Sequence, residues 1–127
     1  WASAKVDDLV NYFPARLTCF LFALVSQNML DVLKLSINDA KKHRSPNAGW
    51  PEAGMARAIG IRLSGPRTYA GKEVNDKWIN VNGSAGNRSN ILDALKIFKF
   101  SMIAFLLLLL AFALAIDYLK IMNNGQM

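Results

Sequence analysis

The densest group of side chains that could do chemistry lies between His43 and Gly60. This segment holds a His, two Arg, a Ser, an Asn and a Glu among two prolines and three glycines. A backbone directed so closely by proline and glycine is typical of a loop with a defined shape. Because apolar segments flank it on both sides, the pattern predicts a polar site held at a bilayer surface.

A short helix is expected to position part of this site. Ser45–Gly49 carries turn signals, and Pro51 and Glu52 both favour the first turn of a helix. We expect that helix to run to Ile59 and to stop at Gly60. Its first amides could cradle an oxyanion, or they could simply belong to a capped helix.

The run from Phe100 to Ile116 is apolar apart from Ser101. As a helix it covers roughly 25 Å, and about 30 Å if it starts at Ile97, which matches the hydrocarbon core of a membrane. A buried helix of a soluble bundle is the alternative, but Leu106–Leu110 is apolar around the whole circumference. We therefore predict an all-α helical membrane protein, here as a fragment, with a large polar cytoplasmic loop.

Three regions follow from these patterns. Residues 1–38 are expected to be an interfacial and membrane-embedded helical segment, residues 39–90 a basic loop, and residues 91–127 a transmembrane helix with its tail. The whole net charge of +6 resides between Asp39 and Lys99, in the middle region and the start of the last one. Excess Lys and Arg indicates the cytoplasmic side of a membrane, so we predict that this region is cytoplasmic. Basic residues do not alternate with aromatic residues as they do in nucleic-acid-binding modules, so we expect no nucleic-acid partner.

Two blocks of sequence resemble one known family. They are DLVNYFPARLT at residues 8–18 and, later, Asp39, HRSPNAGWPEA at residues 43–53, GIRLSGP at residues 60–66, Tyr69 and Gly71. This order and spacing is similar to the adenosylcobinamide-phosphate synthase family of cobalamin biosynthesis (CbiB/CobD), over roughly residues 7–116. Members are longer and have earlier membrane helices. The resemblance therefore implies that this chain is the C-terminal portion of a polytopic, multi-pass protein of the inner (plasma) membrane. The family commonly has a small residue where Arg57 stands.

The resemblance implies amide ligation. Adenosylcobyric acid, a corrinoid, would be joined to aminopropanol phosphate, or to free aminopropanol, with ATP and Mg²⁺ as cofactors. The carboxylate would be activated as an acyl phosphate, so the protein must clamp phosphates and position the amine. Expected partners are the two substrates, the lipid bilayer and other membrane proteins of the cobalamin pathway.

Candidate site residues fall into two groups. The catalytic candidates are Asn47, Glu52 and His43. The substrate-binding candidates are Asp8, Asn11, Arg16, Asp39, Arg44, Ser45, Gly49, Arg67 and Tyr69.

Each candidate has a role with a plainer alternative. Arg44 and Arg67 could bind phosphates or belong to the general basic surplus. Glu52 and Asp39 could hold Mg²⁺ or be ordinary helix charges. His43 could be a general base for the amine or a surface histidine.

Two non-enzymatic readings compete with the ligase. One is an inner-membrane sensor or regulator of the AmpE type, which shares the helices but matches the SPNAGWPE loop less well. The other is a membrane-tethered scaffold whose basic loop binds anionic lipid or a pathway protein.

Overall fold

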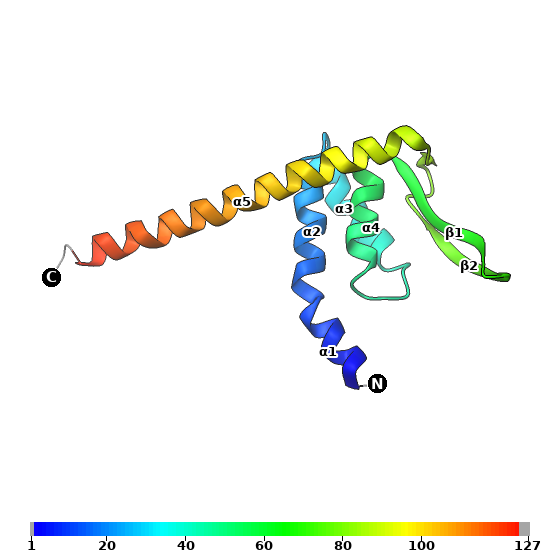
Figure 1. Ribbon diagram of the computed structural model, residues 1–127, viewed down its shortest axis with the longest axis horizontal. Helices are drawn as coiled ribbons and strands as arrows, with labels where there is room; N and C mark the ends of the chain where they lie inside the picture. Colours follow the sequence, from blue (N-terminus) through cyan, green and yellow to red (C-terminus); the bar gives the residue numbers. More distant parts are fainter. Residues whose placement is uncertain (1, 125–127) are drawn as a thin grey trace.

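The computed structural model describes residues 2–124, apart from the side chains of Ala2 and Tyr69. Within residues 2–124, five helices and three strands follow one another (Figure 1). They are α1 (Ala2–Val10), α2 (Tyr12–Leu24), α3 (Met29–Ala40), α4 (Gly49–Ala58), β1 (Ile61–Tyr69), β2 (Lys72–Ile79), β3 (Ser84–Ala85) and α5 (Arg88–Asn124).

Helix α4 is the centre of the packed part. It contacts α2 on one side and α3 on the other, and small residues let the backbones approach closely. A Cβ added at Gly54 would lie 3.0 Å from the sulfur of Cys19 on α2. A Cβ at Gly49 would lie 2.8 Å from the Cβ of His43 and would collide with the carbonyl oxygen of Ala40 at the end of α3. The predicted helix after the loop is confirmed, and it ends before Gly60, whose φ is +71°.

The expectation of an all-α fold is wrong for residues 61–85. Strands β1 and β2 form an antiparallel hairpin, and β3 adds to β1 in parallel, giving the order β2-β1-β3. A bulge separates Ser64 from Pro66, where Ser64 and Gly65 have positive φ. A Cβ at Gly65 would overlap the Trp78 ring, so glycine lets the two strands close. Short, partly exposed strands of this kind carry too few apolar residues to show a clear alternation in sequence.

Helix α5 is long and apolar enough, by length and composition, to cross a membrane. Among the described residues it is the single helix that meets this criterion. Asn87 caps its start by accepting hydrogen bonds from the backbone N–H groups of Ser89 (2.8 Å) and Asn90 (3.3 Å). Figure 1 shows α5 crossing over α2 and then extending away from the other elements. Residues 12–40 form two helices, α2 and α3.

Gly49→Ala tests the close packing of α4 on α3. Helix propensity alone would make this change stabilising, whereas the contact with Ala40 should lower the free energy of unfolding by about 1–3 kcal/mol. Thermal or denaturant unfolding measures the difference. Gly86→Ala is the matched control, because its Cβ would meet only Ile61 at an ordinary 3.7 Å. Equal effects of the two substitutions would contradict this packing.

Candidate active site at the start of α4

The loop before α4 is held by hydrogen bonds between residues two or three positions apart. The hydroxyl of Ser45 accepts from the backbone N–H groups of Asn47 and Ala48, both at 3.3 Å. The backbone N–H of Ser45 donates to Nδ1 of His43 at 3.0 Å. These hydrogen bonds give the loop a defined shape, as its proline and glycine content predicts.

Asn47 joins this loop to the first two helices. Its side chain is buried; Nδ2 donates to the carbonyl oxygen of Asp8 at 2.8 Å, and Oδ1 accepts from Arg16 at 3.2 Å. The Arg16 guanidinium also lies over the rings of Tyr12 and Trp50, 3.4 Å and 4.8 Å from their centroids. Residues from both sequence blocks thus meet at one amide side chain.

His43 and Glu52 face each other across the start of α4, with Nε2 and Oε1 3.5 Å apart. Because Nδ1 of His43 accepts a hydrogen bond from Ser45, the neutral ring carries its proton on Nε2. His43 therefore presents a donor to Glu52, and Nε2 has no lone pair to accept a proton from a substrate. The Glu52 side chain is 44% exposed, so its carboxylate stays accessible to a ligand.

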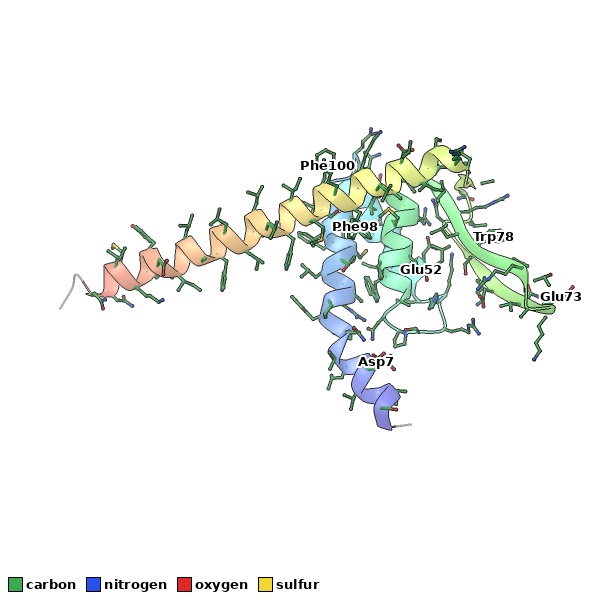
Figure 2. All side chains as sticks on the ribbon, viewed as in Figure 1. Asp7, Glu52, Glu73, Trp78, Phe98 and Phe100 are labelled. Carbon is green, nitrogen blue, oxygen red and sulfur yellow. The ribbon has the colours of Figure 1, made fainter. Side chains whose placement is uncertain are left out.

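An open groove of about 350 Å³ lies between α1–α2 and the loop. Its polar lining includes Asp7, Asn11, Thr18, Ser45 and Asn47. Figure 2 labels Asp7 on α1 and Glu52 on α4. Asp7 accepts a hydrogen bond from Asn11 at 2.9 Å, so Asp7 supplies a carboxylate here while Asp8 supplies its backbone carbonyl. Sequence reasoning missed Asp7, although its four-residue spacing from Asn11 was a usable signal.

Two of the predicted phosphate-binding arginines converge on one carboxylate. Arg67 on β1 lies 2.9 Å from Asp76 on β2, and Arg44 in the loop lies 3.7 Å from the same side chain. The hairpin therefore brings Arg67 next to the loop. Asp76 was not predicted, because its role depends on strand pairing that the sequence does not reveal.

Asp39 is the most completely buried charged group of the site region, at 1% exposure. It accepts hydrogen bonds from Arg57 Nε (2.8 Å), from the backbone N–H of Asn80 (3.1 Å) and from Lys42. Burial opposes ionisation and would raise the pKa of Asp39, but the hydrogen bonds from Lys42, Arg57 and Asn80 outweigh it and hold the pKa below its ordinary value.

The side chain of Asn80 completes this junction. Its Nδ2 donates to the carbonyl oxygens of Ala56 (3.2 Å) and Ile61 (2.9 Å), which ties the end of α4 to β1. Its φ of +52° is one that Asn tolerates better than most residues. Arg57, Lys42 and Asn80 were not predicted as partners of Asp39.

The structure thus brings most candidates together in three places. Asp8, Asn11, Arg16, Ser45 and Asn47 surround the groove; His43 and Glu52 pair beside it; Arg44 and Arg67 share Asp76. Gly49 acts through close backbone packing, and Asp39 through the ion pairs with Arg57 and Lys42. The side chain of Tyr69 lies outside the described residues.

Among the described residues, no three His, Cys, Asp or Glu side chains gather as a metal site. Both oxygens of Asp39 already accept from cationic donors, so this carboxylate does not fit Mg²⁺. Glu52 does fit a Mg²⁺ that is bound chiefly by phosphates, because such an ion needs only one or two protein carboxylates.

Comparison with known proteins identifies the family. The family described as CobD/Cbib protein matches residues 1–98, which includes the loop, the groove and the hairpin. This chain belongs to the CobD/CbiB family of cobalamin biosynthesis. The match stops at the first part of α5.

Several curated relatives carry the name cobalamin biosynthesis protein CobD. The one from Rhodobacter capsulatus is 58% identical over 80 residues, covering 63% of this chain and 26% of the relative. Those from Sinorhizobium fredii and Brucella suis are 45% and 42% identical, covering 74% and 72% of this chain and 31% and 30% of the relatives. The chain therefore spans less than a third of these CobD proteins. No solved structure matches it.

The Asp39 ion pairs predict a specific acid sensitivity. A carboxylate with a lowered folded-state pKa stabilises the fold above its unfolded pKa of about 4, and this contribution is lost as pH falls through the folded value. Asp39→Asn should lower the free energy of unfolding by about 3 kcal/mol at neutral pH, because Arg57 keeps a buried charge without its counterion. The difference between wild type and variant should shrink in acid.

Denaturant unfolding between pH 7 and pH 3 measures this difference. Asp93→Asn is the control, since the Asp93–Lys96 pair is 3.7 Å long and exposed, and it should change stability little. A constant difference between wild type and Asp39→Asn across this pH range would contradict the assignment.

Proposed function

We propose that the loop, the groove and the hairpin form part of the cytoplasmic active site of an amide ligase. The reaction joins adenosylcobyric acid to aminopropanol phosphate, or to aminopropanol, with ATP. The observation that carries this proposal is the buried Asn47, which links both family blocks around one open groove. A loop that served only as a charged tether would not need this connection.

Arg44 and Arg67 are proposed to bind phosphate groups. Arginine offers paired donors that match phosphate oxygens, and both side chains are substantially exposed. Asp76 would hold the two guanidinium groups near each other before a phosphate arrives. Removing Asp76 should therefore leave their charge in place while loosening their arrangement.

Glu52 is proposed to hold Mg²⁺, which would neutralise phosphate charge when bound. His43 would orient Glu52 through its Nε2–H group. The predicted role of His43 as a general base requires its ring to release Ser45 first, because Nδ1 is already engaged. Asn11 and Ser45 would line the groove for the substrate, and the backbone of Asp8 would hold Asn47 in place. The substrate amine must approach the activated carboxyl carbon.

The membrane placement is part of the same proposal. Helix α5 would cross the inner membrane, with residues 39–90 on the cytoplasmic side and residues 1–38 at or in the bilayer. The basic excess of the central region supports this orientation. The other membrane proteins of the pathway would then be neighbours in the same bilayer.

Product formation in lipid nanodiscs tests the proposal. The chain is assayed alone and as a replacement for the matching segment of the Rhodobacter capsulatus relative, with both substrates, ATP and Mg²⁺. Mass spectrometry detects adenosylcobinamide phosphate. Asn47→Ala should lower kcat/KM by about 100-fold, because it releases Arg16 and the Asp8 carbonyl and displaces the groove.

Asn82→Ala is the matched control, since Asn82 lies exposed in the turn between β2 and β3, outside the loop, the groove and the hairpin. It should leave product formation unchanged. A folded chimera that forms no product with either amine would contradict the ligase and favour the AmpE-like sensor. Unchanged product formation by the Asn47→Ala variant would mean that the loop is not part of the active site.

A further inference from the structure

Helices α1 and α2 carry one continuous apolar stripe. Its members recur every one to four residues and fall on one face of a helix. They are Val6, Leu9, Val10, Phe13, Leu17, Phe20 and Leu24. The backbone stays helical at Asn11, between the two elements, and the N–H of Asn11 donates to the carbonyl of Asp7 at 3.0 Å. The stripe therefore extends along both helices.

The other faces of these helices are already occupied. Cys19 and Ala23 are buried, with Cys19 against Gly54 of α4, while Asn11 and Thr18 face the groove. Within residues 2–124 the stripe is most open in its first half, where Leu9 is 77% exposed and Phe13 is 70% exposed, and it is half-buried toward the end of α2, where Leu24 is 39% exposed. Apolar side chains exposed in a row this long mark a binding surface.

A hydrogen bond fixes the point along α5 at which α2, and with it the stripe, is attached. The buried hydroxyl of Ser101 donates to the carbonyl oxygen of Leu21 at 3.2 Å. Ser101 stands in the first turn of the apolar run Phe100–Ile116, so α2 meets α5 where that run begins. If α5 crosses a bilayer, this meeting point lies at the membrane surface.

The direction of α2 also fits a position at the membrane surface. Figure 1 shows α2 running across α5 and not alongside it. Phe98 and Phe100 are more than half exposed and lie near this crossing (Figure 2), next to the exposed Lys96 and Lys99. Aromatic and lysine side chains are favoured at the boundary between headgroups and acyl chains.

We propose that α1 and α2 lie in the plane of the membrane surface, with the stripe inserted into a phospholipid bilayer. An amphipathic helix of this kind buries its apolar face roughly 5–10 Å deep. The hydrogen bond from Ser101 to the backbone of Leu21 would hold the stripe-bearing helix α2 at this depth. The groove opens from another face of the same helices, so this anchor would hold the site beside the lipid. The proposal depends on the membrane crossing by α5 and not on the ligase chemistry.

Depth-dependent fluorescence quenching tests this placement. The 127-residue chain, with Cys19→Ala, carries an environment-sensitive label on one new cysteine at a time. Val10→Cys, Phe13→Cys and Phe20→Cys sample the stripe, and Asn11→Cys and Thr18→Cys sample the groove face as matched controls. Leu109→Cys marks the middle of the apolar run. Nanodiscs of phosphatidylcholine and phosphatidylglycerol contain lipids with a doxyl quencher at a shallow or a deep acyl position.

The shallow quencher should act more strongly than the deep one at the stripe, and neither should act strongly at the groove face. Leu109 should show the opposite depth order. Weak quenching at all stripe positions, with Leu109 quenched deeply, would mean that protein covers the stripe and would overturn the proposal. Deep quenching at the stripe would make α2 a membrane-spanning helix and also overturn it. An unquenched Leu109 would refute the membrane crossing itself, and with it the anchor, while leaving the ligase assay unaffected.

Discussion

The arrangement of the site depends on one buried carboxylate. Asp39, at the end of α3, receives Arg57 from α4, the backbone of Asn80 after β2, and Lys42 from the following turn. Burying a charge away from water costs several kcal/mol of folding free energy unless the charge is paired and hydrogen-bonded. These three partners must therefore keep their positions around Asp39. Through Asp39 the helices and the hairpin keep a common geometry, and the loop between Asp39 and α4 has both ends fixed.

The contacts of the loop depend on the geometry that Asp39 fixes. Asn47 reaches back to α1–α2 and meets Arg16, whose guanidinium packs over Tyr12 and Trp50. The hairpin adds Arg67 beside Arg44 from the other side. The loop therefore contributes to two polar sites, the open groove through Ser45 and Asn47 and the arginine pair through Arg44. The proposed ligase reaction would use both.

Local sequence patterns were enough for some of these features. Proline and glycine predicted the loop, Glu52 and Gly60 marked the two ends of α4, and the run after Phe100 predicted the apolar helix. The resemblance of two sequence blocks predicted a family that the comparison with known proteins bears out. Each of these signals lies within a few residues or in a specific motif.

Other features depend on contacts between distant residues and could not be predicted. The hairpin is stabilised by a bulge that lets Trp78 pack on Gly65, and this packing has no local signature. Arg57 reaches Asp39 only because the fold packs α4 against the end of α3, a contact that the sequence does not reveal. The pairing of Arg67 with Asp76 likewise requires knowledge of the strand register.

Isotope transfer tests the central claim, that this region serves phosphate-dependent amide ligation, most directly. Adenosylcobyric acid labelled with ¹⁸O in its reacting carboxylate is converted by the chimera with the Rhodobacter capsulatus relative. Activation by phosphoryl transfer predicts that one labelled oxygen stays in the new amide and the other leaves in inorganic phosphate. Amide product accompanied by unlabelled phosphate would contradict the account.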